Sequence, residues 1–231
     1  MFFTHRLNRE RKGGKIVFTA DTEVIVPRII SSEYIKKTIN KELVTDTVPE
    51  DATVCKKITF LVGFTDEIKE KIKKHTDISG NDEEYALLIG EETVVCAKEE
   101  RGLLYGLSTL VHLIDAGEMS ARLIYDYPVC SVRGYRVYMP GSENIGIFKE
   151  MIDLIAYYKY NAIILEIGGA MEYKKHPEIN EGWEHFCKTI NSMPGVDGSR
   201  SFQGADAYWK DSLHTELCNG SYLTQAEVRD I

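Results

Sequence analysis

Apolar residues recur with two different spacings over the first half of the chain. Short runs of β-branched and aromatic residues predict strands, and apolar residues three or four positions apart predict helices. The predicted strands cover residues 15–20, 23–30, 58–63, 84–89, 93–97 and 120–125. The predicted helices cover residues 31–43, 65–75 and 99–115. Strands and helices mixed in this order predict an α+β domain, a mixed sheet with helices, over residues 1–125.

The predicted helix over residues 99–115 has a pronounced amphipathic pattern. Acidic residues in its first turn suit the positive end of the helix dipole. One apolar stripe runs along it, formed by Leu103, Leu104, Leu107, Leu110, Val111 and Ile114. Such a stripe must pack against another element. The strands before it, joined by Gly90, Glu91 and Glu92 as a hairpin turn, are expected to supply that surface.

The pattern changes after residue 125. Residues 132–139 predict a strand that Pro140 and Gly141 stop, and Ser142 is expected to cap the helix that follows. One face of that helix is apolar, with Phe148, Met151, Ile152, Ile155 and Tyr158. Residues 162–167 are almost wholly apolar and predict a strand buried on both faces. This order predicts a βαβ unit, in which the two strands are parallel.

Three further elements are expected before the last residue. A short helix is predicted to begin at Pro177 and to end near Asn191. Residues 192–206 are rich in Gly and Ser and predict a loop. Thr224 is expected to cap another helix.

Five stretches of the chain carry a pattern beyond secondary structure. They cover residues 100–110, 126–134, 153–161, 172–178 and 220–228. In order and spacing these stretches resemble glycoside hydrolase family 20, the β-N-acetylhexosaminidases. They are similar to the last helix of the small front domain, the entry into the first barrel strand, the first barrel helix, the segment after the second strand and the start of the next helix. The resemblance implies that residues 126–231 begin a (β/α)₈ TIM barrel, and that the parent protein cleaves N-acetylhexosamine-containing glycans without a cofactor.

The ends of the two predicted barrel strands depart from the family pattern. The family carries an Asp and a sugar-gripping Arg after its first strand, where this chain has Tyr138 and Gly141. A His and a pair of Asp usually end the second strand, where Glu166, Gly168 and Gly169 stand here. The family's catalytic Asp-Glu pair follows the fourth strand, so the resemblance assigns no catalytic residue to this chain.

The length of the second half also bears on activity. From Val132 to Ile231 the chain has 100 residues, whereas a closed (β/α)₈ barrel needs about 250. We therefore expect a divergent and truncated member, whose barrel is incomplete and which is inactive by itself. Two other functions stay open: another barrel glycosidase with a similar front domain, or a non-catalytic carbohydrate-binding or assembly module.

Three residues are predicted to bind the carbohydrate substrate: Glu166, Tyr138 and Trp209. The active face of such a barrel lies at the carboxyl ends of its strands, where Tyr138 and Glu166 stand. A carboxylate in an apolar strand needs a partner or a wet cleft. Glu166 therefore binds either a sugar hydroxyl or a neighbouring cation such as Arg136.

Trp209 belongs to a group of aromatic residues in the region after the second strand. The others are Trp183, Phe186, Phe202 and Tyr208. Sugars stack their apolar faces on exposed aromatic rings, so members of the group can line a subsite. Core packing is the favoured interpretation for Trp183 and Phe186.

Charge and cysteine content exclude several other functions. The formal net charge is −8 and the pI about 5.4, so the chain as a whole lacks the basic surface of a nucleic-acid-binding protein. The one basic cluster, over residues 6–15, is interpreted as a solvated tail. No apolar run approaches the roughly 18 residues of a membrane span, and the first residues lack the order of a secretory signal. Five cysteines, an odd number, argue against a disulfide framework, and together these features favour the cytoplasm.

Metal and nucleotide chemistry have no support in the sequence. His185, Cys187, His214 and Cys218 are zinc-ligand types, but the first spacing is too short for the usual zinc site. No P-loop or Gly-x-Gly-x-x-Gly motif occurs. We expect no metal and no cofactor. The apolar strands 132–139 and 162–167 would leave open edges. We therefore expect the barrel portion either to be covered by a second copy of the chain, giving a homo-oligomer through these barrel edges, or to be locally disordered, mainly within 192–215.

Overall fold

The computed structural model describes residues 7–117, 119–192 and 220–231. The chain divides into two compact units, Met1–Ser131 and Val132–Ile231. Among the described residues, no helix is long and apolar enough to cross a membrane.

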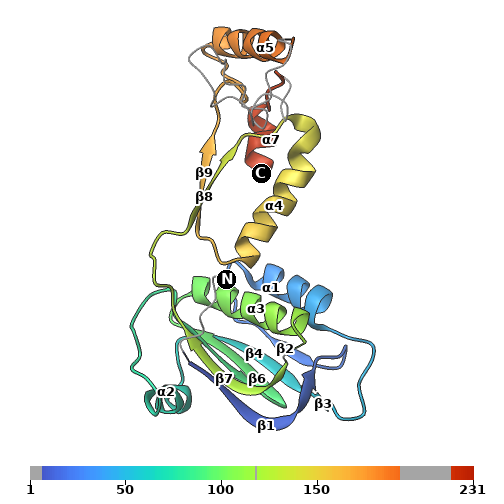
Figure 1. Cartoon of the computed structure of the whole chain (residues 1–231), viewed down its shortest axis with the longest axis vertical. Helices are drawn as coiled ribbons and strands as arrows, with labels where there is room; N and C mark the ends of the chain where they lie inside the picture. The colour runs from blue at the N-terminus through green and yellow to red at the C-terminus, as the bar shows by residue number, and fades with distance from the viewer. Residues whose placement is uncertain (1–6, 118, 193–219) are drawn as a thin grey trace, which may run out of the picture. The chain divides into compact units, whose positions relative to one another are not determined.

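The first unit is built on a mixed sheet of seven strands (Figure 1). Its strands are β1 (Leu7–Val17), β2 (Glu23–Ile25), β3 (Thr53–Val54), β4 (Lys57–Val62), β5 (Tyr85–Ile89), β6 (Glu92–Ala97) and β7 (Ser120–Asp126). They lie in the order β2-β4-β6-β5-β7-β1-β3. The pairs β2–β4, β4–β6 and β1–β3 are parallel, and β5 is antiparallel to both β6 and β7. The expectation of an α+β fold with a mixed sheet is confirmed.

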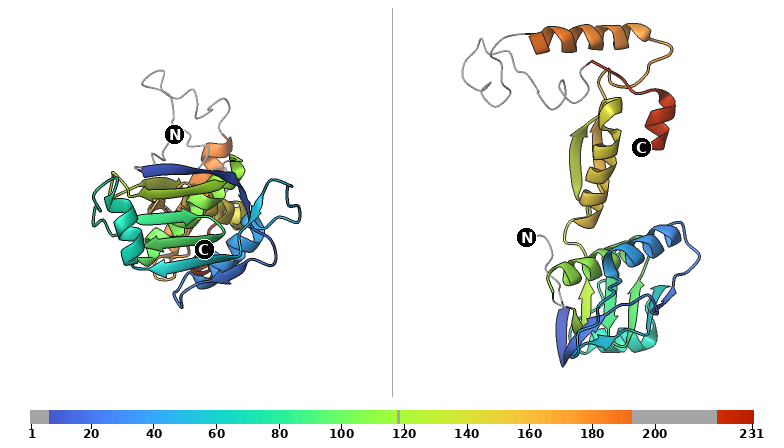
Figure 2. Two further views of the ribbon diagram at one scale, coloured as in Figure 1. Left: turned by 90° about the horizontal axis from the view of Figure 1, so that it is seen from below. Right: turned by 90° about the vertical axis from the view of Figure 1, so that its right-hand side faces the viewer.

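Helices cover both faces of this sheet. Helix α1 (Ser32–Thr38), which continues as the π-helix η1 (Ile39–Leu43), and helix α3 (Glu100–Asp115) lie on one face, and α2 (Asp66–Lys73) lies on the other (Figure 2). Two glycines let α3 approach the sheet closely. A Cβ on Gly106 would lie 2.7 Å from Val95 Cγ1, and a Cβ on Gly102 would lie 2.7 Å from Ala97 Cβ. These glycines were not part of the expected stripe, although Leu103, Leu107, Leu110 and Val111 are buried as it predicted.

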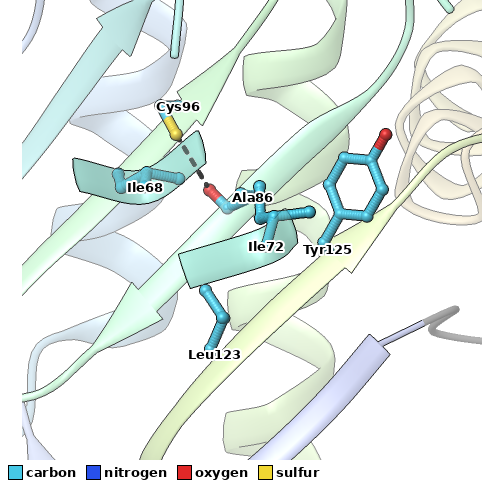
Figure 3. Close-up of a cluster of buried hydrophobic side chains, with 6 residues drawn as sticks. All are labelled: Ile68, Ile72, Ala86, Cys96, Leu123 and Tyr125. Atoms are coloured by element: carbon cyan, nitrogen blue, oxygen red, sulfur yellow. Dashed lines mark hydrogen bonds between the residues drawn. The ribbon is translucent and has the colours of Figure 1, made fainter. Parts of the chain in front are cut away.

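The face of the sheet under α2 has its own apolar cluster, shown in Figure 3. It consists of Ile68 and Ile72 from α2, Ala86 and Cys96 from β5 and β6, and Leu123 and Tyr125 from β7. Thr65 begins α2 as the pattern predicted, because its hydroxyl accepts a hydrogen bond from the Ile68 N–H at 3.3 Å. Residues of β5 and β6 alternate between the α2 and α3 faces, which explains why β5 and residues 94–97 of β6 are apolar on both faces.

Two predictions about the first unit are wrong. The basic cluster is not a solvated tail, because Leu7–Val17 forms β1, with Leu7 opposite Tyr125 and Glu10 opposite Arg122 of β7. β1 meets β3 only at Ile16 and Val17, so its first residues form an edge strand, a position that tolerates charged residues. The predicted strand over 23–30 is limited to β2, which ends at Ile25, two residues before Pro27.

The second unit contains a parallel pair of strands joined by a helix, as the βαβ prediction requires. β8 (Gly134–Tyr138) is parallel to β9 (Ala162–Glu166), and Gly134 pairs with Ala162. Helix α4 (Ile145–Tyr157) connects them and lies along the pair in both Figure 1 and Figure 2. Helices α5 (Pro177–Ser192) and α7 (Gln225–Asp230) complete the described part. Both helices were predicted, and Thr224 forms a capping box with Glu227.

Three expectations about this unit need correction or lie outside the structure's description. Ser142 does not cap α4: it opens the 3₁₀ turn η2 (Ser142–Asn144), and Asn144 is the residue that precedes α4. β9 is not buried on both faces, because Ile163 and Ile164 are 39% and 61% exposed. The sheet formed by the described residues here has two strands, and Ile163 and Ile164, as adjacent residues, leave exposed apolar surface on both faces of β9. The predicted loop over 192–206 lies, except for its first residue, outside the described residues.

Candidate functional site

Three polar or aromatic side chains share one face of the β8–β9 pair. Tyr138 pairs with Glu166, and Arg136 stands two residues before Tyr138 on the same side of its strand. Arg136 Nη2 donates a hydrogen bond to Glu166 Oε2. The guanidinium carbon also lies 5.4 Å from the centroid of the Tyr138 ring, a cation–π arrangement. The predicted substrate residues Glu166 and Tyr138 are therefore brought together, with Arg136 between their functional groups.

The ion pair with Arg136 explains how the Glu166 carboxylate is stabilised in an apolar strand. The ion-pair alternative is the contact that the structure contains. The pair is nonetheless open to solvent, since the side chains of Arg136 and Glu166 are 61% and 39% exposed. A sugar hydroxyl can therefore reach a carboxylate and a guanidinium that are already oriented toward each other.

The loop that follows β9 is held by one buried side chain, Asn180 of α5, which is 5% exposed. Its Nδ2 group donates to the carbonyl oxygens of Gly169 (2.9 Å) and Met171 (2.7 Å), and its Oδ1 accepts from the Tyr173 N–H (2.9 Å). The Tyr173 hydroxyl donates to the Gly168 carbonyl at 3.0 Å. The sequence pattern did not reveal Asn180, because a polar residue in a surface helix gives no sign that it is buried.

The chain returns to this loop just before α7. The Leu223 N–H donates to the Ala170 carbonyl (2.9 Å), and the Glu172 N–H donates to the Leu223 carbonyl (2.8 Å). The N–H of Gln225, the first residue of α7, donates to Glu172 Oε2 at 3.4 Å. Ala170 and Leu223 are fully buried. The backbone at the carboxyl end of β9 is thus fixed from two sides.

The other candidate residues either lie outside the described part of the chain or are not brought to Glu166 and Tyr138. Trp209 lies outside the described residues, as do His214 and Cys218 of the zinc-like pattern. Trp183 is partly buried against the cluster of Met139, Ala170 and Leu223, which agrees with core packing. Phe186 is 48% exposed, so the core-packing interpretation is wrong for it. Within the described part of the chain, no group of three His, Cys, Asp or Glu residues could hold a metal ion.

Comparisons with known proteins give fold matches and no sequence matches. No family model matches the sequence, and no curated protein does. A glycoside hydrolase family 20 β-N-acetylglucosaminidase superimposes with a TM-score of 0.60 and 16% identity, over 100% of this chain and 39% of its own. The fold is that of part of a family 20 enzyme. The resemblance predicted from the five stretches is confirmed at this level.

Two further family 20 structures give the same result. The exo-β-N-acetylglucosaminidase from Vibrio harveyi in complex with N-acetylglucosamine has a TM-score of 0.60 and 15% identity, over 100% of this chain and 33% of that one. The β-N-acetylhexosaminidase from Streptomyces coelicolor A3(2) has a TM-score of 0.57 and 17% identity, over 96% of this chain and 41% of that one. The chain therefore spans about a third to two fifths of the family 20 enzymes that it matches.

In the first unit, buried tyrosines form hydrogen bonds with carboxylates. The Tyr125 hydroxyl donates to Oε2 of Glu84 (2.6 Å) and accepts from the Ser79 N–H (2.7 Å). Burial, together with the hydrogen bond to Glu84, raises the pKa of Tyr125 to about 12. The Tyr85 hydroxyl lies 2.7 Å from Thr109 Oγ1 and donates to Asp126 at 3.0 Å, and burial raises its pKa well above the usual value. These groups tie the sheet together and are not accessible to a ligand.

An acidic depression of about 540 Å³ lies at the start of α3. It is lined by Asp82, Glu83, Glu99, Glu100, Arg101 and Leu104. Several of its charges already have partners within the chain: Arg101 lies 3.2 Å from Glu83, and Glu100 Oε1 accepts from the N–H (2.8 Å) and hydroxyl (2.6 Å) of Ser31. The charges of Glu83, Glu100 and Arg101 are therefore used in contacts within the first unit.

Proposed function

We propose that the chain is part of a glycoside hydrolase that acts on N-acetylhexosamine-containing glycans, and that β8, α4 and β9 begin its (β/α)₈ barrel. The observation that supports this most directly is the fold match over the whole chain, at a TM-score of 0.60, to family 20 enzymes. The parallel β8–β9 pair supports the barrel, because its apolar residues Ile163 and Ile164 are exposed and suit further neighbours.

In this proposal Glu166 and Arg136 bind hydroxyl groups of the sugar, and Tyr138 contributes a ring edge beside them. They stand at or near the carboxyl ends of their strands, the face on which such barrels carry their active sites. A carboxylate and a guanidinium complement the donor and acceptor character of a hydroxyl. Trp209 is proposed to stack on the same substrate.

The 231-residue chain alone is proposed to bind glycan without cleaving it, since no residue in it can be assigned as the family's acid pair. We expect no turnover of an aryl β-N-acetylglucosaminide. Turnover that survives repurification and disappears in Glu166→Gln would contradict this.

Binding is tested by titrating the chain with N,N′,N″-triacetylchitotriose. Glu166→Gln should weaken binding by about 10- to 100-fold, the range expected for a lost hydrogen bond to a charged group. Glu150→Gln removes an exposed carboxylate from α4 and serves as the matched control. Equal affinity of Glu166→Gln and the unchanged chain, with the fold intact, would reduce Glu166 to a structural partner of Arg136.

One observation favours the second candidate, a non-catalytic carbohydrate-binding module. Glu166 is paired with Arg136 within the chain, and neither residue is assigned a catalytic role, so the pair suits a surface that binds a glycan without cleaving it. A longer form of the protein that binds the trisaccharide and shows no hydrolysis would support the module over the hydrolase.

A further inference from the structure

Helix α4 has a second apolar face besides the one that packs on β8 and β9. The packed face contains the two buried residues of the helix, Phe148 and Ile155. The second face is open to solvent. It consists of Ile147 (67% exposed), Leu154 (55%), Tyr158 (43%), which directly follows the helix, and the half-buried Met151. We refer to these four residues as the outer α4 face.

The spacing of the outer α4 face suits another helix. Its members follow one another at intervals of four, three and four positions. Residues three and four apart on a helix are surface neighbours, so the four side chains form one continuous row. The same spacing defines the a and d positions of a heptad, where the side chains of one helix pack between those of another. A helix lying along α4 would therefore cover the whole row.

Acidic residues run along one side of the outer α4 face. Glu150 is three positions from Ile147 and four from Leu154, and Asp153 is three positions from Glu150. Both acidic side chains are exposed, and neither has an ion-pair or hydrogen-bond partner among the residues that the structure describes. Charges beside a heptad row select the partner helix, because opposite charges attract and like charges repel. The complementary helix therefore carries Lys or Arg beside its own apolar row.

A second copy of α4 does not meet this requirement. Its one basic residue, Lys149, stands on the opposite side of the helix from the outer face. Lys149 Nζ also lies 2.7 Å from Asp230 Oδ2 of α7. Two copies packed α4 against α4 would thus offer no basic residue to Glu150. An anionic membrane is disfavoured as well, because its surface repels carboxylates.

We propose that the outer α4 face of the 231-residue chain binds an amphipathic helix of another protein, with basic residues toward Glu150 and Asp153. The inference goes beyond the proposed function and does not depend on it. Glu166 and Arg136 belong to β9 and β8, whereas the outer face belongs to α4 and the residue after it. The chain would accordingly take part in an assembly whether or not it binds a glycan.

The test is an NMR titration of the full 231-residue chain with a synthetic helical peptide of about three heptads, with Leu at the a and d positions and Lys at the e and g positions. A second peptide carries Glu in place of each Lys. The methyl groups of Ile147 and Leu154 report binding. We expect the Lys peptide to shift these methyl resonances and the Glu peptide to leave them unchanged.

Two substitutions separate the apolar from the charged contribution. Leu154→Gln should weaken binding of the Lys peptide by about 10- to 100-fold, the range expected when a leucine side chain is no longer buried. Glu150→Lys should weaken it by about two- to fivefold, as for an exposed ion pair, and should strengthen binding of the Glu peptide. The matched controls are Ile30→Gln, at an apolar residue that is 99% exposed, and Glu181→Lys, at an exposed acid of α5. Neither control should change the affinity.

Each other outcome would overturn the inference. These outcomes are unshifted methyl resonances with the Lys peptide, equal binding of the two peptides, and undiminished binding by Leu154→Gln. Methyl resonances of Ile147 and Leu154 that move with protein concentration in the absence of peptide would identify a second copy as the occupant, and would also overturn it. The trisaccharide titration tests the proposed function separately, so either proposal can fail alone.

Discussion

Tyr125→Phe removes one oxygen atom from the best-defined hydrogen-bond network of the first unit. In the native chain Tyr125 is 0% exposed, and its hydroxyl connects the Glu84 carboxylate (2.6 Å) with the Ser79 N–H (2.7 Å). Phenylalanine keeps the ring and its packing. The loss is therefore confined to two hydrogen bonds, one of them to a charged acceptor.

The magnitude follows from those two bonds. A hydrogen bond to a charged group contributes about 1.5–3 kcal/mol, and a buried group left without its partner costs about 1–3 kcal/mol. Glu84 keeps the Ser79 hydroxyl (2.8 Å) and the Gly80 N–H (3.0 Å) as donors. The carboxylate thus remains stabilised, and we expect Tyr125→Phe to lower the free energy of unfolding by about 2–3 kcal/mol.

The same substitution should change the pH dependence of stability. Tyrosine in an unfolded chain has a pKa of about 10, and in the folded chain the pKa of Tyr125 is about 12. Between these values the unfolded state loses a proton that the folded state keeps, so stability falls as pH rises. Tyr125→Phe should remove this part of the loss. The part due to Tyr85, whose pKa is also raised by burial, should remain.

Urea unfolding followed by far-UV circular dichroism at pH 8 and pH 11 measures both effects. Hydrogen exchange of peptides from β5 and β7 assigns the change to the first unit. Tyr34→Phe is the matched control, because Tyr34 is 46% exposed and should change stability by less than about 0.5 kcal/mol. A Tyr125→Phe chain with unchanged stability and the same alkaline loss would refute the reasoning that this network is strong and excluded from water.

Three other outcomes can be measured on the same chain. Gly106→Val should lower the free energy of unfolding by about 1–3 kcal/mol or more, because the added side chain pushes α3 away from Val95. Gly146→Ala is its control in thermal melts and should leave stability unchanged or raise it, because a Cβ there meets nothing within 4 Å. Asn180→Ala should speed hydrogen exchange of the Tyr173 amide, which donates to Asn180 Oδ1. Asn180→Asp should speed it less, because Asp keeps the acceptor oxygen. Equal exchange rates in the unchanged chain and in both variants would contradict this role of Asn180. Light scattering should show self-association through the open edges of β8 and β9 that Ile164→Lys reduces, and a monodisperse monomer of the unchanged chain would disprove it.

The sequence alone determined most of the secondary structure, because the signals for it are local. The apolar stripe on α3, the Thr65 cap of α2 and the capping box at Thr224 each depend on residues within a few positions of one another. The order of strand, helix and strand also indicated the parallel β8–β9 pair, since a helical connection of this kind joins parallel strands.

Only the tertiary structure decided which residues meet over long distances in the chain. β1 is a strand because β7, over a hundred residues later, supplies its hydrogen bonds, and no local pattern among charged residues predicts that. Arg136 and Glu166 are 30 residues apart, and the structure contains the ion pair between them that the sequence offered as one of two alternatives. Asn180 and Phe186 stand on the same helix, yet one is buried and the other exposed. Burial depends on which elements pack against each face of a helix, and the sequence of the helix itself does not show which elements these are.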